Sequence, residues 1–238
     1  MLSSKKIVLT CEHGGNFIPK IFRPLFRHQR RLLSSHRGWD IGALSIAQLM
    51  QKTLRVPLHY STVSRLLVDL NRFPTSTTLF SEITGKLTSK QKQKILAAFY
   101  TPYWKKLDRL FNHYRKKNVQ IIHVGVHSMT GQLNGRKRDM NLALLYDPQR
   151  PAEKKFCNEW IKQLKAIRPS LKIARNRPYR GTGDGVTCFH RNLFPSQDYL
   201  GIELEINQSL LALLDANGKK DLAQLLMTSL VRTTCQNP

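Results

Sequence analysis

The stretch VQIIHVGVHSMTG, residues Val119–Gly131, decides the fold predicted for this chain. It opens with apolar and β-branched residues, a pattern typical of a strand that is buried on both faces. From His127 onward the residues become small and polar, so the strand is predicted to end there. Ligands of open α/β sheets bind just beyond the carboxyl ends of strands. His127 is therefore a candidate functional residue, and the alternative is a structural histidine at the end of a strand.

Two further apolar runs predict strands that end at chemically reactive residues. Ile7–Cys11 leads to His13, which is followed by two glycines that allow unusual backbone conformations. A tight turn with an incidental histidine is the alternative there. Leu66–Leu70 leads to Asn71 and Arg72 before a Phe-Pro pair stops it.

Gly201–Asn207, GIELEIN, alternates apolar and acidic residues and is a strand by its periodicity. Glu203 and Glu205 are two positions apart, so their side chains share one face of that strand. An acidic pair that faces solvent is the alternative explanation. Other predicted strands are Val56–Tyr60, Leu142–Tyr146 and Leu171–Ala174.

Helical periodicity connects these strands. Asp40 opens an amphipathic segment that runs to Leu54, and it either caps a helix or faces a metal. Residues 88–117 carry apolar residues mostly on one face, and Pro102 predicts a kink or two separate helices. Another helix begins at Pro151, and the leucine-rich C-terminal segments are also predicted to be helical.

The composition is that of a single α/β domain spanning residues 1–238, because chains of this length often stay undivided. Hydrophobic residues make up 41% of the chain and the mean hydropathy is −0.37. No apolar run approaches the roughly 18 residues of a membrane span. The four cysteines are scattered, which argues against a cysteine-based zinc knuckle and favours a reducing cytoplasm. The N-terminus lacks the pattern of a signal peptide.

The charge balance is strongly basic, with 39 Lys and Arg against 15 Asp and Glu and a formal net charge of +24. Such a charge attracts nucleic acids, anionic surfaces or small acidic substrates. The basic residues are spread along the chain and do not alternate regularly with aromatic residues, as a base-stacking platform would. A solvated basic surface is favoured, and nucleic-acid binding is not excluded.

The residues at the predicted strand ends include two imidazoles and several carboxylates. Two histidines and a carboxylate are a ligand set of catalytic zinc, which keeps one position open for water. A further carboxylate can carry a proton from water to a leaving amine, and an arginine can hold a substrate carboxylate through paired donors. Because these residues are far apart in sequence, a metallohydrolase and other α/β enzymes both stay open on this basis.

Six blocks of the sequence resemble, in order, those of the N-formylglutamate amidohydrolase family. The resemblance extends from about Ile7 to Leu211, and the blocks read CEHGGNFIP, HRGWDIGA, SRLLVDLNR, HVGVHSMTG, RPYRGTGDG and GIELEINQ. Several blocks are also similar to the wider zinc carboxypeptidase and aspartoacylase group. VDLNR resembles the carboxylate-binding Asn-Arg pair of that group, and LEIN resembles the block of its catalytic glutamate.

The resemblance implies a three-layer α/β/α fold with a mixed, mainly parallel central sheet, as in zinc carboxypeptidases. It implies hydrolysis of the amide bond of N-formylglutamate or a related small acidic N-acyl amino acid. By position, His13 and His127 would be zinc ligands and Glu205 the general base and acid. Asn71 and Arg72 would bind the substrate α-carboxylate, with Arg65 as an additional anion or oxyanion contact.

One position departs from the pattern of the wider group. The acidic zinc ligand expected three residues after the first histidine is replaced by Asn16. Asparagine is a poor zinc ligand, so the third ligand must come from elsewhere. Asp40 is the preferred residue. Glu12 is the alternative, although it neighbours His13 and would tend to point to the opposite face of an extended chain.

Three functional hypotheses follow. The leading one is a cytoplasmic zinc-dependent amidohydrolase that acts on N-formylglutamate or a related N-acyl amino acid. The second keeps the fold and widens the substrate to a peptide or a cell-wall fragment. The third is a basic nucleic-acid-binding protein on a hydrolase scaffold, which the retained His13, His127 and Glu205 argue against. The sequence predicts nothing about the oligomeric state.

Overall fold

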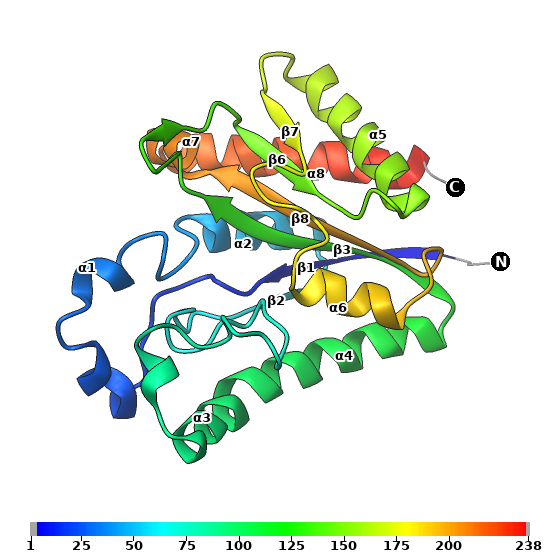
Figure 1. Cartoon of the computed structure of the whole chain (residues 1–238). Helices are drawn as coiled ribbons and strands as arrows, with labels where there is room; N and C mark the ends of the chain where they lie inside the picture. The colour runs from blue at the N-terminus through cyan, green and yellow to red at the C-terminus, as the bar shows by residue number, and fades with distance from the viewer. Residues whose placement is uncertain (1–3, 237–238) are drawn as a thin grey trace.

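The computed structural model describes residues 4–236, and its centre is a six-stranded sheet (Figure 1). The strands follow the order β2-β1-β3-β8-β6-β7, and each pair of neighbours is parallel except the antiparallel pair β6 and β8. The expected mixed, mainly parallel sheet is therefore confirmed. Its strands are β1 (Ser4–Cys11), β2 (Leu58–Tyr60), β3 (Val119–Met129), β6 (Leu142–Leu145), β7 (Ile173–Arg175) and β8 (Tyr199–Asn207).

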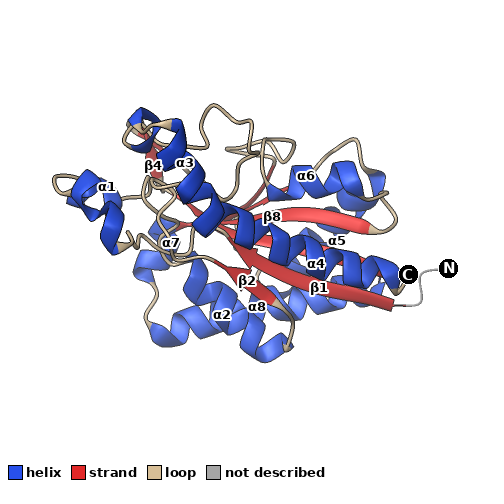
Figure 2. Ribbon diagram, turned by 90° about the horizontal axis from the view of Figure 1, so that it is seen from below, coloured by secondary structure: helices blue, strands red, loops and turns tan. Residues whose placement is uncertain are grey.

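Helices cover both faces of this sheet, which gives the three-layer α/β/α arrangement (Figures 1 and 2). One face is covered by α2 (Ala43–Leu54), α5 (Pro151–Ile167) and α8 (Ala216–Gln236). The other face is covered by α4 (Thr101–Lys116) and α6 (Val186–Leu193). The remaining elements are η1 (Lys20–Phe26), α1 (Arg30–Leu33), η2 (Thr84–Lys86), α3 (Ser89–Ile95), the π-helical η3 (Leu96–Tyr100), the hairpin strands β4 (Gln132–Leu133) and β5 (Arg136–Lys137), and α7 (Gln208–Leu213).

The central strand β3 is buried on both faces, as its apolar sequence predicts. Ile122, Val124 and Val126 join the core under α2, α5 and α8. Ile121 joins the opposite core, under α4. Because side chains alternate along a strand, His123 and His127 lie on the same face of β3 as Ile121, which is the face covered by α4. His127 is also near the carboxyl end of β3.

The carboxyl ends of β1, β3 and β8 meet at one edge of the sheet, because these three strands are parallel neighbours. The described N- and C-terminal residues lie at the opposite end of the molecule (Figure 1). No helix within residues 4–236 is long and apolar enough to cross a membrane.

One sequence-based expectation of secondary structure is wrong, and one of the two interpretations of Asp40 is excluded. The run Leu66–Leu70 is a series of turns instead of a strand. Four of its apolar side chains pack into the core under α4, so the burial that the run signals is met without pairing in the sheet. Asp40 does not cap α2, because the residue at the cap position is Gly42 and its helix has no side-chain cap.

Pro102 marks the expected interruption of the 88–117 segment. The helix there divides into α3, the π-helical η3 and α4, and Pro102 lies in the first turn of α4, directly after the π-helical segment.

Candidate active site

A cleft of about 830 Å³ opens at the carboxyl edge of β1, β3 and β8. Its lining contains the seven residues that the sequence assigns to metal binding, catalysis and substrate binding: His13, Asp40, Arg65, Asn71, Arg72, His127 and Glu205. The structure thus brings together seven residues that are spread over nearly 200 positions of the sequence.

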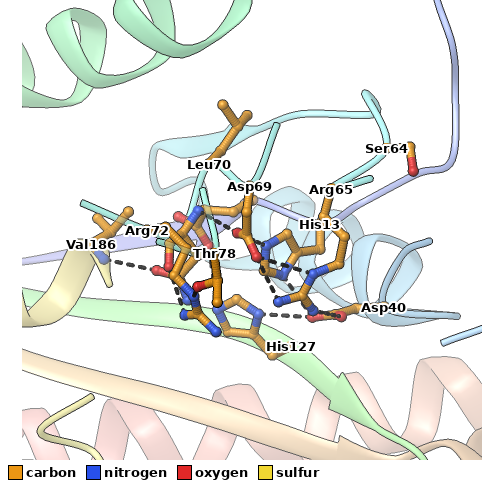
Figure 3. Close-up of polar contacts among 12 residues, drawn as sticks. His13, Asp40, Ser64, Arg65, Asp69, Leu70, Arg72, Thr78, His127 and Val186 are labelled. Atoms are coloured by element: carbon orange, nitrogen blue, oxygen red, sulfur yellow. Dashed lines mark hydrogen bonds and ion pairs between the residues drawn. The ribbon is translucent and has the colours of Figure 1, made fainter. Parts of the chain in front are cut away.

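His13, Asp40 and His127 lie close together in this site (Figure 3). Each offers one ligand atom, and these atoms lie within 4.8 Å of one another. Nδ1 of His127 lies 2.8 Å from Oδ2 of Asp40, and Nδ1 of His13 lies 3.5 Å from the same oxygen. The three side chains are at most 6% exposed.

The donor set of this trio fits a metal cation such as zinc. Nδ1 of His13 is buried and has no hydrogen-bond partner among residues 4–236. A buried polar atom without a partner is costly. Two imidazoles and a carboxylate that converge on one point match the three protein ligands of catalytic zinc sites.

Main-chain contacts hold the trio together. The backbone N–H of Asp40 donates to the carbonyl of His13 at 2.9 Å, so the loop that carries one candidate ligand anchors the other. Gly14 continues this loop and donates its N–H to the carbonyl of Ser61 at 2.9 Å. A Cβ on Gly14 would lie only 2.8 Å from that carbonyl oxygen, so the close approach of the two loops requires glycine.

The second nitrogen of each imidazole faces another carboxylate. Nε2 of His13 donates to Oδ1 of Asp69 at 2.6 Å, and Nε2 of His127 lies 3.3 Å from Oε2 of Glu12. Glu12 thus approaches the His127 ring from the nitrogen opposite to the one that faces Asp40. This arrangement favours Asp40 over Glu12 as the third ligand.

Asn16, at the position where the wider group carries its acidic ligand, points elsewhere. Its Nδ2 donates to the carbonyl of Leu33 at 3.1 Å, and it does not line the cleft.

Arg65 lies against the carboxylates that surround the trio. It makes ion pairs with Asp69 at 2.8 Å and with Asp40 at 3.4 Å. Burial alone would raise the pKa of Asp69, but the Arg65 guanidinium outweighs it and, together with His13, holds the pKa of Asp69 well below its usual value. Arg65 therefore keeps the buried Asp69 carboxylate ionised, while its partly exposed side chain still reaches the cleft.

Arg72 is an uncompensated positive charge at the cleft wall. Its Nη1 donates to the carbonyl of Asp184 at 2.8 Å and its Nε to the hydroxyl of Thr78 at 3.2 Å. No ion pair joins Arg72 to a carboxylate anywhere in the described chain. Carbonyl and hydroxyl contacts orient the guanidinium without neutralising it, so Arg72 is suited to bind an anion.

Asn71 is held in place beside Arg72. Its Oδ1 accepts the backbone N–H of Val186 at 2.8 Å, and its own N–H donates to Oδ1 of Asp69 at 2.9 Å. A Cβ on Gly185 would lie 2.7 Å from Oδ1 of Asn71, so the close contact depends on this glycine. The loop before α6 and the turn at Asn71 therefore position each other.

Glu205 lies next to His127 across the β3–β8 pair. Its Oε2 is buried without a hydrogen-bond partner among residues 4–236. Burial is the main reason why the pKa of Glu205 is raised to about 7. Glu203 lines the same cleft, as the alternation of the strand predicts, but its Oε1 accepts a hydrogen bond from Thr187 at 3.1 Å.

Asp69 and Glu12 are site residues to which the sequence assigned no such contacts. Both are adjacent to predicted positions, Asp69 in the VDLNR block and Glu12 in the CEHGG block. No periodicity distinguishes a carboxylate that faces a histidine from one that faces solvent, so the contacts become visible only in three dimensions.

Comparisons with known proteins identify the family of this chain. The model of the N-formylglutamate amidohydrolase family matches residues 5–212. A comparison with curated protein sequences finds no significant match.

Two crystal structures are similar over nearly the whole chain. A gene product of Agrobacterium tumefaciens has 26% sequence identity and a TM-score of 0.83, covering 97% of this chain and 91% of its own. N-formylglutamate amidohydrolase from Ralstonia eutropha JMP134 has 17% identity and a TM-score of 0.70, covering 98% and 95%, and supports the fold alone. With its family model matched over most of its length, the chain belongs to the N-formylglutamate amidohydrolase family.

Proposed function

We propose that this protein is a zinc-dependent amidohydrolase that cleaves the amide bond of N-formylglutamate or a related small acidic N-acyl amino acid. One observation carries the proposal. The Nδ1 atoms of His13 and His127 lie 3.5 Å and 2.8 Å from one carboxylate oxygen of Asp40. Glu205 lies beside His127 and has a buried oxygen without a partner in the described chain. Family membership supports the reaction class.

In this proposal His13, Asp40 and His127 hold the zinc ion. Zinc at such a site would lower the pKa of water toward 7 and polarise the amide carbonyl. The three protein ligands leave the cleft side open to water and substrate, since all three line the cleft wall.

Glu205 is the proposed general base and acid. Its carboxylate accepts a proton from the attacking water and then delivers it to the nitrogen of the leaving amino acid. Burial raises the pKa of Glu205, which favours a group that can be unprotonated before attack and protonated afterwards. Water is consumed, the C–N bond breaks, and for N-formylglutamate the products are formate and glutamate.

Arg72 and Asn71 are the proposed binding groups for the substrate α-carboxylate. Arg72 brings a charge without an ion pair in the described chain, and its planar fork suits a carboxylate. Arg65 is the proposed further contact for an anionic group or for the oxygen of the amide, although its two ion pairs leave it fewer free donors.

A hydrolysis screen tests this function. Formylated and acetylated amino acids, short peptides and cell-wall fragments are incubated with the purified protein, with and without a chelator. The expected result is hydrolysis of N-acyl amino acids that have a free α-carboxylate, abolished by the chelator and restored by zinc. Chelator-sensitive cleavage of peptides or cell-wall fragments alone would replace the proposed substrate. Hydrolysis that the chelator does not affect would contradict the metal requirement.

A further inference from the structure

We propose that Glu12, held by Tyr103, is a positioning residue that orients the His127 imidazole so that its Nδ1 faces the metal. This inference rests on the proposed function, because it assigns a role at the same metal centre. It concerns a carboxylate that lies behind the cleft: Glu12 is 1% exposed and does not line the cleft.

The two candidate ligand histidines have the same arrangement of partners. In each ring Nδ1 faces Asp40 and Nε2 faces a second carboxylate, Asp69 for His13 and Glu12 for His127. A carboxylate on the outer nitrogen of a ligand histidine fixes its proton on that nitrogen and leaves the other nitrogen free to bind metal.

The Oε2 oxygen of Glu12 contacts His127 and makes no hydrogen bond within residues 4–236. Oε2 is buried and lies 3.3 Å from Nε2 of His127. A buried carboxylate costs free energy unless it is paired. The burial of the Glu12 carboxylate is explained if Nε2 of His127 carries the proton and donates toward Oε2.

Tyr103 holds the other carboxylate oxygen of Glu12, Oε1, by a hydrogen bond. Its hydroxyl donates to Oε1 at 2.8 Å, and the tyrosine is only 5% exposed. The Tyr103 ring stacks on His59 with centroids 4.0 Å apart, and Nε2 of His59 donates to the Tyr103 carbonyl at 2.9 Å. The hydrogen bond at the hydroxyl and the stacking of the ring both restrain the Tyr103 side chain. Tyr103 thereby connects the proposed metal centre to the first turn of α4.

Gly125 leaves space for this contact on β3. It lies two residues before His127 and therefore on the same face of the strand. A Cβ at this position would lie 3.3 Å from Nε2 of His127, the nitrogen that faces Glu12. The bare backbone keeps that edge of the ring open to the carboxylate.

The test measures zinc affinity, which is independent of substrate. Zinc dissociation constants are determined by chelator competition for wild type, Glu12→Gln and Tyr103→Phe, together with the unfolding free energy of each metal-free protein. Tyr199→Phe is the matched control, because it removes a buried hydroxyl that contacts His123 on the same face of the sheet. ¹⁵N NMR of the zinc-loaded protein reports which nitrogen of His127 binds metal.

Glu12→Gln is expected to weaken zinc binding about 10- to 100-fold, the usual effect of removing such a partner. Tyr103→Phe is expected to weaken it by a smaller factor, and Tyr199→Phe to leave it unchanged. In wild type, Nδ1 of His127 should be metal-bound and Nε2 protonated. If Glu12→Gln does not fold, the comparison of the two tyrosine variants still decides.

Unchanged zinc affinity in both Glu12→Gln and Tyr103→Phe, with only the unfolding free energy lowered, would show a purely structural role and overturn the inference. Metal bound through Nε2 of His127 would also overturn it. Failure of the wild type to bind zinc would instead contradict the proposed function, so the two failures are distinguishable.

Discussion

The imidazole rings of His13 and His127 lie with their centroids 5.4 Å apart and their planes inclined by 58°. They come from residues 114 positions apart in sequence (127 − 13). Because β1 and β3 are parallel neighbours, whatever follows one strand lies beside the end of the other. Asp40 then joins them through its hydrogen bond to the His13 backbone, which brings the three proposed metal ligands together.

Asp40→Asn should weaken zinc binding more than Glu12→Gln does, because it replaces a proposed ligand and not a partner of one. The loss of zinc affinity should therefore exceed the roughly 10- to 100-fold that is typical for removing a residue that contacts a metal ligand and not the metal. Equilibrium dialysis against zinc measures it. Glu82→Gln is the control, since Glu82 is a carboxylate at the cleft rim whose one ion pair within residues 4–236 is with the exposed Arg37. Equal zinc affinity in Asp40→Asn and wild type would remove Asp40 from the ligand set.

Arg72→Lys should lower kcat/KM for free-carboxylate substrates by roughly 10- to 100-fold, about the 1.5–3 kcal/mol of a hydrogen bond to a charged group. Lysine keeps the charge but lacks the planar two-donor fork. The measurement compares N-formylglutamate with its α-amide, which should be affected much less. Arg37→Lys at the cleft rim is the control. Equal losses for acid and amide would assign Arg72 a structural role.

Glu205→Gln should keep zinc and lower kcat by about 10²- to 10⁴-fold, the range for a lost general base. The amide of glutamine cannot accept a proton from water. Glu203→Gln is the matched variant, because it lies on the same face of β8 but accepts a hydrogen bond from Thr187. It should mainly lower the unfolding free energy. A near-normal kcat in Glu205→Gln beside an inactive Glu203→Gln would reverse the assignment.

His123 should make the protein sensitive to acid. It is fully buried between Thr10 and Tyr199, and burial lowers its pKa to about 3 against the opposing pull of the Glu12 carboxylate. In the unfolded chain its pKa returns to about 6.5. Below pH 6.5 the unfolded state therefore binds the extra proton, and the unfolding free energy falls with pH by up to about 1.4 kcal/mol per unit until about pH 3.

His123→Gln removes that titration and should flatten the stability profile. Urea unfolding between pH 4 and pH 7 measures both proteins, and the difference between the two profiles isolates His123 from other titrating groups. Parallel profiles would mean that His123 does not carry this pH dependence.

The sequence predicts the central strands well because their burial leaves a strong signal. Residues 119–127 and 201–207 read as strands through apolar content and alternation, and the structure contains both, with β3 continuing to Met129 and β8 beginning at Tyr199. Leu66–Leu70 carries the same apolar signal and is wrong as a strand, because its side chains reach the core from a turn. Apolar content reports burial, whereas sheet pairing also needs a neighbouring strand.

The candidate site is predictable to the extent that strand ends collect reactive residues. His13, His127 and Glu205 follow from that rule. Asp40 cannot be derived in this way, because it reaches the site through a backbone contact between two loops. The ion pair between Arg65 and Asp69 cannot be predicted from the sequence either, because Asp69 lies in a turn whose shape depends on packing under α4.

The most direct test of the metal mechanism is a titration of metal-free protein with zinc while formate release from N-formylglutamate is measured. Activity should be absent without metal and rise linearly to a sharp break at one zinc ion per chain, as a single three-ligand site requires. The His127→Ala variant should show no such rise. Full activity in the metal-free wild type would contradict the central claim.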